Sequence, residues 1–191
     1  MTPGPDAAAL FLVSAFTLSG ACQTWWLSAP ISRRFDWPLD GGRMWRGRRV
    51  LGANKTWRGV LVMVPATAVS FAIVRAAWPP AAADRLWALS IAEYAVLGFW
   101  AGLGFMAGEL PNSFVKRQLD VPPGAAAGGR WRGLLLAVAD RCDSVAGALI
   151  ALAIVVPVPP GTWIIVGLVG PALHGTFSVA MFCLGGKSRL G

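Results

Sequence analysis

Five long apolar segments restrict the fold of this chain more than any other feature. They cover about residues 7–27, 60–78, 86–108, 134–156 and 162–184. Each is close to the roughly 20 residues that a helix needs to cross the hydrocarbon core of a bilayer. Only 14% of the 191 residues are charged, against about a quarter in a soluble domain. We therefore predict an all-α, polytopic integral membrane protein with about five transmembrane helices, organised as one domain over residues 1–191.

Basic residues gather in three of the stretches outside these segments, whereas the connections at 79–85 and 157–161 carry little charge. The basic residues are Arg33, Arg34, Arg43, Arg46, Arg48, Arg49, Lys55 and Arg58 in the first loop, Lys116, Arg117, Arg130 and Arg132 in the second, and Lys187 and Arg189 in the tail. Lys and Arg of multi-pass proteins collect on the cytoplasmic side. We therefore predict a cell-membrane protein with the N-terminus outside and both motif loops and the C-terminus in the cytoplasm.

The net charge of +8 is explained by these cytoplasmic loops, so we expect membrane lipids and no nucleic acid among the partners. The first apolar segment has no cationic stretch before it, which indicates a retained span rather than a signal peptide. Cys22, Cys142 and Cys183 are far apart and predict neither a disulfide framework nor a metal site. No internal repeat of the kind found in many transporters is visible. Homodimer formation stays open.

The fourth apolar segment contains Asp140, Arg141 and Asp143. Ionised groups at membrane depth are costly, and most of those that occur serve a function. A spacing of three on a helix places both aspartates on one face, where two carboxylates repel each other unless a cation lies between them. Carboxylate oxygens suit Mg²⁺, with Mn²⁺ as the alternative. The competing interpretation is an ion pair between Arg141 and one aspartate that only stabilises the helix bundle.

Two further segments carry groups that bind phosphate. In GELPNSFVKRQLDVPPG, residues 108–124, Glu109 ends the third apolar segment, and Lys116 and Arg117 follow one to two helical turns later. In GGRMWRGRRVLGANKTWRG, residues 41–59, glycines let the backbone approach a phosphate while Arg and Lys supply charge. A patch for anionic lipid head groups is the alternative for this loop. Metal ligands beside phosphate-binding cations fit phosphoryl or nucleotidyl transfer.

These three motifs resemble those of the CDP-archaeol synthase family, relatives of the CDP-diacylglycerol synthases. The stretch ending in Asn-Lys-Thr-Trp-Arg-Gly at 54–59 looks like the first-loop signature of that family. Residues 108–117 resemble its Gly-Asp-Leu-x-x-Ser-Phe-x-Lys-Arg segment, and DRCD at 140–143 is similar to the Asp-Arg-x-Asp that closes the CDP-diacylglycerol synthase signature. The order of the motifs, the chain length and the five-span layout agree with the family as well.

The resemblance implies a membrane-embedded cytidylyltransferase of phospholipid biosynthesis, in which a glycerolipid phosphate attacks the α-phosphate of CTP to give a CDP-lipid and pyrophosphate. It implies that Asp140, Asp143 and Glu109 hold Mg²⁺ and that these three residues and Lys116 are catalytic. The implied substrate-binding residues are Asn54, Lys55, Arg58, Asn112, Ser113, Arg117 and Arg141.

Two departures from the family pattern leave the lipid open between a diether and a diacyl phosphate. Glu109 stands where the family usually has Asp, and Ala139 to Asp143 differs from the archaeal Leu-Asp-Gln-Leu-Asp. The alternatives to an enzyme are a carrier with an ion path of buried carboxylates, and a relative that binds lipid or nucleotide without turnover. The pattern of CDP-alcohol phosphotransferases is absent. Glu93 either pairs with Arg75 or Arg141 or lines a cavity, and His174 either packs in its helix or touches the site.

Overall fold

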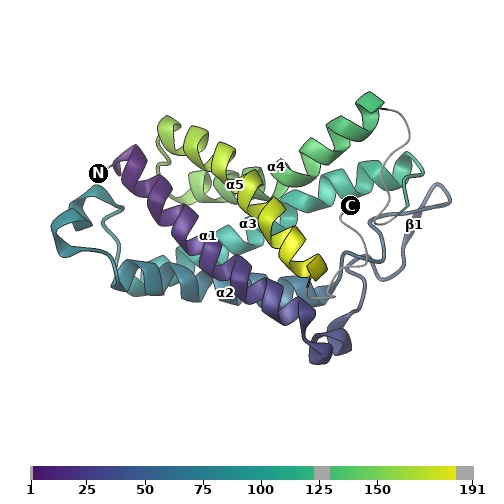
Figure 1. Ribbon diagram of the computed structural model, residues 1–191, viewed down its shortest axis with the longest axis horizontal. Coiled ribbons are helices and arrows are strands. Elements are labelled where there is room, and N and C mark those ends of the chain that lie inside the picture. Colours follow the sequence, from purple (N-terminus) through teal and green to yellow (C-terminus); the bar gives the residue numbers. More distant parts are fainter. Residues whose placement is uncertain (1, 123–129, 184–191) are drawn as a thin grey trace.

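The computed structural model describes residues 2–122 and 130–183 and consists almost entirely of helices (Figure 1). The predicted all-α, polytopic fold is confirmed. Short 3-10 turns, η1 (Pro30–Phe35) and η2 (Pro80–Arg85), and a hairpin of β1 (Met44–Trp45) and β2 (Arg48–Arg49) lie between the helices. The helices are α1 (Pro5–Ser28), α2 (Trp57–Ala76), α3 (Ile91–Gln118), α4 (Arg130–Val155) and α5 (Pro160–Cys183).

Four of these helices, α1, α2, α3 and α5, are long and apolar enough to cross a membrane. The helix α4 has 26 residues, which is also sufficient length, but Asp140, Arg141 and Asp143 interrupt its apolar sequence. Lys187 and Arg189, which contribute to the predicted orientation, lie outside the described residues, as do the end of the second motif at 123–124 and the side chains of Arg130 and Arg132.

The helix α3 differs most from the predicted span at 86–108. It begins later because Ser90 caps it: the Ser90 side chain accepts a hydrogen bond from the Glu93 N–H, and the Glu93 carboxylate accepts one from the Ser90 N–H. Glu93 thus completes a capping box and takes none of the roles that the sequence suggested. The helix also continues through Pro111 to Gln118, so most of the second motif is helical rather than a loop.

Glycines let α3 approach its two neighbouring helices closely. On Gly98, a Cβ atom would lie 2.6 Å from the carbonyl oxygen of Thr67 in α2. Against α4, a Cβ atom on Gly108 would lie 2.3 Å from the carbonyl oxygen of Asp143, and one on Gly147 would lie 2.3 Å from that of Gly104. Small residues at such spacings allow the backbones of membrane helices to touch. The contact brings the second motif of α3 directly against the aspartates of α4.

The apolar core fills the half of the bundle that lies toward the N-terminal end of α1. Phe11 sits at its centre, with its ring centroid 5.0 Å from that of Tyr94 and 5.2 Å from that of Phe71. All three side chains are fully buried. Large buried side chains of this kind provide most of the packing energy, so this half of the molecule holds the helices in place while the opposite half carries the polar motifs.

The first loop is ordered by a buried carboxylate. Asp40 accepts hydrogen bonds from the Arg49 guanidinium at 2.7 Å and from the N–H groups of Leu51 and Gly42, each at 3.0 Å. Burial raises the pKa of Asp40, but these donors outweigh it and hold the pKa at about 2. Within the hairpin, Arg46 and Gly47 form the turn with positive φ angles of 50° and 76°, as a tight hairpin requires.

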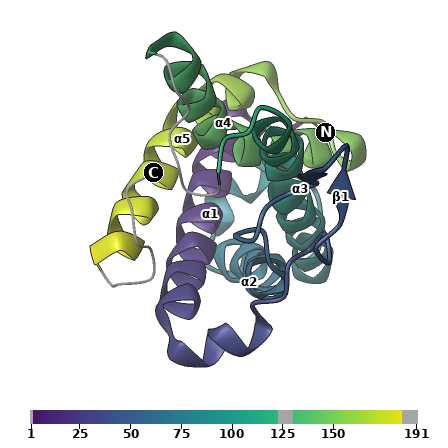
Figure 2. The same ribbon diagram turned by 90° about the vertical axis from the view of Figure 1, so that its right-hand side faces the viewer.

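The hairpin is anchored to the C-terminal end of α3, beside which it lies in both views (Figures 1 and 2). Arg48 donates to the carbonyl oxygen of Gln118 and to the carboxylate of Asp120, each at 2.5 Å. These bonds connect the first loop to α3 across more than sixty residues of sequence. The loop therefore has a defined position next to the polar end of α3, and the residues that follow it, including Lys55, are held there.

Candidate active site between α3 and α4

A polar cluster forms where α3 and α4 cross, and one amide lies at its centre. The Nδ2 atom of Asn112 donates to Asp140 Oδ1 at 2.7 Å and to Asp143 Oδ2 at 3.1 Å. The two aspartates face α3 together, as their spacing predicts. Two carboxylates that share one donor lie close enough to repel each other unless cations compensate their charge.

Two lysines supply this compensation from different segments. Lys116 of α3 forms an ion pair with Asp140, and Lys55 of the first loop forms one with Glu109. Both ammonium groups are held in place, since the Lys116 and Lys55 side chains are only 15% and 20% exposed. Glu109, Asn112 and Lys116 lie on one face of α3 because they are three and four residues apart. The cluster therefore combines three carboxylates with two ammonium groups.

Ser144 is the member of the cluster that the sequence reasoning missed. Its hydroxyl donates to Glu109 Oε1 at 2.7 Å, and its backbone N–H donates to Asp143 Oδ1, also at 2.7 Å. The residue is fully buried. It follows Asp143 directly and lies four residues after Asp140, so its position on the same helix face was the available signal. Ser144 joins the carboxylate from α3 to the pair on α4.

The donor chemistry of the cluster fits a hard divalent cation. Mg²⁺ is usually held by one or two carboxylates together with water and substrate phosphates, and Asp140 and Asp143 provide two carboxylates that converge on a common point. Among the described residues, no group of three or more His, Cys, Asp or Glu side chains lies close enough to form a complete protein cage for a metal. The residues present thus fit a site that substrate oxygens complete.

Arg117 and His174 border the cluster. Arg117 has its Nε and Nη1 atoms buried without a hydrogen-bond partner among the described residues, and its charge acts on Asp140. His174 of α5 interacts electrostatically with Glu109, and its ring lies 6.3 Å from that of Phe105. A buried guanidinium nitrogen without an acceptor is costly in the protein alone, so Arg117 has unused capacity to bind an anion.

Of the remaining residues implied by the resemblance, Asn54, Arg58 and Ser113 make no hydrogen bond or ion pair with Asp140, Asp143 or Glu109 within the part of the chain that the structure describes. Arg58 pairs instead with Asp36 at 3.6 Å. Asn54 is exposed in the turn before Lys55, and Arg141 is exposed on α4. Ser113 is half-buried on α3 beside Asn112. Among the described residues, the ion pair of Asp140 is made by Lys116.

Comparison with known proteins identifies one family over most of the chain. The family model CarS-like, described as CDP-archaeol synthase, matches residues 35–189. A CDP-archaeol synthase of Halobacterium salinarum is 38% identical over 159 residues, covering 80% of this chain and 82% of the relative. Those of Halorubrum lacusprofundi and Pyrococcus furiosus are 33% and 29% identical, covering 80% and 84% of this chain and 82% and 87% of the relatives. No solved structure matches.

The matched region includes every residue of the polar cluster, from Lys55 in the first loop to Ser144 in α4. It also includes the hairpin and the glycine contacts that hold α3 against α4. The length of the match and the identity to the relatives are sufficient to assign the family. The chain belongs to the CDP-archaeol synthase family.

Proposed function

We propose that this protein is a membrane-embedded cytidylyltransferase that converts CTP and a glycerolipid phosphate to a CDP-lipid and pyrophosphate. An oxygen of the lipid phosphate attacks the α-phosphorus of CTP. The bond from that phosphorus to the bridging oxygen of the β-phosphate breaks, and pyrophosphate leaves with the electron pair. The observation that carries the proposal is the Asn112 amide that holds Asp140 and Asp143 beside two nearly buried lysines.

The basic residues of the cluster suit the phosphates of the two substrates. Phosphoryl transfer depends mainly on positioning and on neutralising charge, and Lys55 and Lys116 provide point charges at the crossing of α3 and α4. Arg117 adds buried donors that have no acceptor within residues 2–122 and 130–183. A lipid phosphate is already anionic near neutral pH, so its oxygen needs no strong general base. We assign these residues to binding and orientation of the phosphates.

Asp140 and Asp143 are the residues that would hold Mg²⁺ or Mn²⁺, and Glu109 is joined to Asp143 through Ser144. When bound, such an ion would neutralise negative charge on the reacting phosphates. In the protein itself, Asn112 orients the two aspartates and Ser144 orients Glu109. The two lysines neutralise part of the negative charge of the three carboxylates and so reduce the repulsion between them.

The lipid is proposed from the relatives. They are named CDP-archaeol synthases, so a diether phosphate of the archaeal type is the first candidate. A diacyl phosphate is the alternative, because Glu109 and the segment from Ala139 to Asp143 depart from the family pattern. The reaction takes place at the cytoplasmic face in this proposal, where CTP is available and the lipid phosphate lies at head-group level.

The test uses the purified full chain in detergent with Mg²⁺ and labelled CTP, offered phosphatidic acid and the archaeal diether phosphate in parallel. Labelled CDP-lipid together with pyrophosphate is the expected product, and the better lipid identifies the substrate class. Asp143→Asn, which keeps the shape of the side chain, serves as the matched inactive control. CTP binding without product from either lipid would indicate a binding-only relative. Absence of CTP binding would exclude the cytidylyltransferase and favour a carrier.

A further inference from the structure

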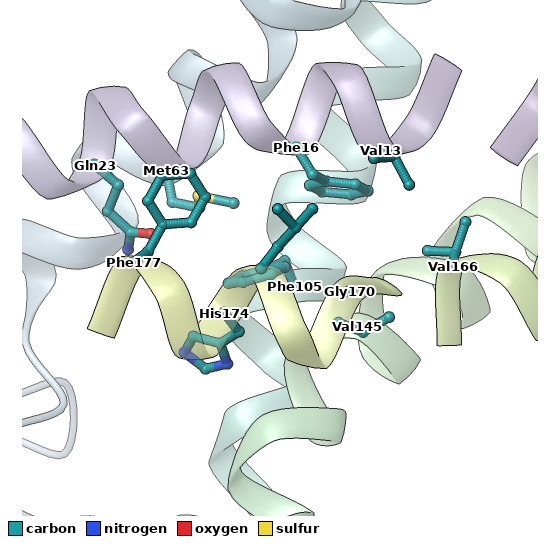
Figure 3. A pocket seen from close by; sticks show the side chains of 12 residues that line it. Val13, Phe16, Gln23, Met63, Phe105, Val145, Val166, Gly170, His174 and Phe177 are labelled. Carbon is teal, nitrogen blue, oxygen red and sulfur yellow. The ribbon is translucent and has the colours of Figure 1, made fainter. Parts of the chain in front are cut away.

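An apolar pocket lies between α1 and α5 in the interior of the bundle (Figure 3). The two helices run side by side in the same direction. Near their first residues, the Thr162 hydroxyl donates to the carbonyl oxygen of Pro5 at 3.0 Å. Toward their last residues, a Cβ atom on Gly20 would lie 2.6 Å from the Phe177 ring. The pocket occupies the space between these two points of contact.

The pocket is lined almost entirely by apolar groups, with two polar side chains at one end. One end is lined by Val13 of α1 and Val166 of α5, and the other by Gln23 and His174. Val13 and Gln23 are ten residues apart on one helix, which corresponds to about 15 Å along the helix axis. In Figure 3, Phe16 lies between these ends, and the amide of Gln23 lies at the end next to Phe177.

This end of the pocket adjoins the polar cluster between α3 and α4. His174 lines the pocket and also interacts electrostatically with Glu109, and its Nδ1 atom is buried without a hydrogen-bond partner among the described residues. Phe105 of α3 connects the two regions as well, since it lines the pocket and its ring lies 6.3 Å from that of His174. A molecule with a phosphate at the cluster can therefore place a chain in the pocket.

We propose that this pocket binds a hydrocarbon chain of the lipid phosphate substrate, an assignment that rests on the proposed function. The hydrophobic effect favours a chain in an apolar pocket, and the polar end fixes the direction in which the lipid lies, with its phosphate toward Glu109 and its chain toward Val13. The buried residues of α5 are only Thr162 and Val166, so few side chains tie this helix to the bundle and the bilayer can supply the lipid from its side.

The first test fills the apolar end of the pocket with Val13→Trp and compares lipid phosphates of different chain length. In Val13→Trp, a long-chain lipid phosphate should lose the contacts of about two or three methylene groups. This loss corresponds to a fall of about tenfold in kcat/KM. A short-chain lipid phosphate that does not reach Val13, and the KM for CTP, should change by less than about twofold. Leu10→Trp, at an exposed position of the same helix, is the matched control and should behave like wild type.

A second apolar groove, between α3 and α4, gives the competing location. It is lined by residues that include Leu103, Ile150 and Ile154, and it is filled by Ile150→Trp. If Ile150→Trp and not Val13→Trp produces the dependence on chain length, the chain binds between α3 and α4 and the proposal is wrong. Equal losses for long and short lipids in Val13→Trp would overturn it as well.

Binding is measured separately from turnover with a lipid phosphate that carries a photoreactive diazirine in its chain. The expected cross-links map to residues 13–23 and 166–177, diminish in Val13→Trp, and are competed by unlabelled lipid phosphate but not by a neutral lipid with the same chains. Equal competition by the neutral lipid would show an ordinary bilayer lipid in the pocket, and protection of the pocket by a second copy of the chain would show a dimer contact. Either result would overturn the proposal. Specific cross-linking in a wild-type protein that forms no CDP-lipid would refute the proposed cytidylyltransferase activity but not lipid binding in the pocket.

Discussion

Asn112 uses one amide group to hold both aspartates of the facing helix, so its removal should disturb the site more than its size suggests. Hydrogen bonds to charged groups are worth about 1.5–3 kcal/mol each, and Asn112 makes two of them. We expect Asn112→Ala to lower kcat/KM for CTP by about 100-fold. Gln118→Ala, which removes an amide from the same helix, should change it by less than about threefold. Near-normal activity of Asn112→Ala would remove this residue from the site.

Ser144 is predicted to act through Glu109. In Ser144→Ala the buried carboxylate loses its hydroxyl donor, which costs about 1–2 kcal/mol. We expect kcat/KM to fall by about tenfold and the Mg²⁺ concentration for half-maximal rate to rise. The control is Thr67→Val, which removes another buried hydroxyl, bonded to the Met63 carbonyl within α2. If both variants lose only thermal stability, to the same extent, Ser144 has a packing role and no influence on the site.

The chemistry-bearing residues of the site were predictable because charges at membrane depth are rare and conspicuous. Asp140 and Asp143 follow from their spacing on one helix face. Ser144 carries no charge, and its role depends on a carboxylate that arrives from α3, so its position on the same helix face as Asp140 was too weak a signal to single it out. Glu93 was ambiguous for the opposite reason: a charge in an apolar segment suggests function, but Ser90 three residues earlier already indicates a capping box.

At the scale of helices, the site depends on the close contact between α3 and α4. Gly147→Ala places a methyl group 2.3 Å from the Gly104 carbonyl oxygen, and backbone cannot yield as a flexible side chain does. The helices must separate, and a misplacement of about 1 Å costs on the order of 100-fold in rate. We expect that loss in kcat together with a lower thermal midpoint. Gly167→Ala, whose methyl group meets nothing within 4 Å, should match wild type in both assays.

The first loop should depend on the ionised form of Asp40. Since its pKa lies at about 2 in the folded protein, below the ordinary 3.8, the carboxylate stabilises the loop above about pH 4, and the contribution disappears as pH falls toward 2. The shift corresponds to about 2 kcal/mol. Asp40→Asn should therefore speed hydrogen exchange of the Leu51 N–H by about 30-fold at pH 7. Exchange at wild-type rates would show that the hairpin is held by Arg48 alone.

The positions of the helices were well predicted from apolarity, while their ends were not. The span at 86–108 became a helix from Ile91 to Gln118, because Ser90 and Glu93 define its start and because the polar face from Glu109 to Lys116 is paired with α4 and Lys55. Apolarity cannot mark the end of a helix whose last turns are polar and buried against another polar segment. The crossing of α3 and α4 depends on glycines whose partners only the fold reveals.

Across the whole molecule, the polar motifs and the weakly charged connections lie at opposite ends. At one end, the Gly4 N–H donates to the Arg85 carbonyl at 2.8 Å, and the Trp87 indole donates to the Pro157 carbonyl at 2.9 Å. The N-terminus, the α2–α3 connection and the α4–α5 connection are therefore neighbours. In such an arrangement α4 runs the length of the bundle despite its charges. We predict that it crosses the membrane as the fifth span, which would put the start of α1 and the end of α5 on opposite sides.

This arrangement predicts the accessibility of single cysteines placed in a variant whose native Cys22, Cys142 and Cys183 are replaced by serine. Positive charge favours the cytoplasm, so Arg46→Cys in the hairpin should react with a membrane-impermeant maleimide only in inverted vesicles. Asp84→Cys and Pro160→Cys should react only in intact cells. Pro160→Cys is the decisive position, because it reacts from the same side as Arg46→Cys if α4 fails to cross the membrane. That result would leave four crossing helices and place the aspartates of α4 in a re-entrant segment.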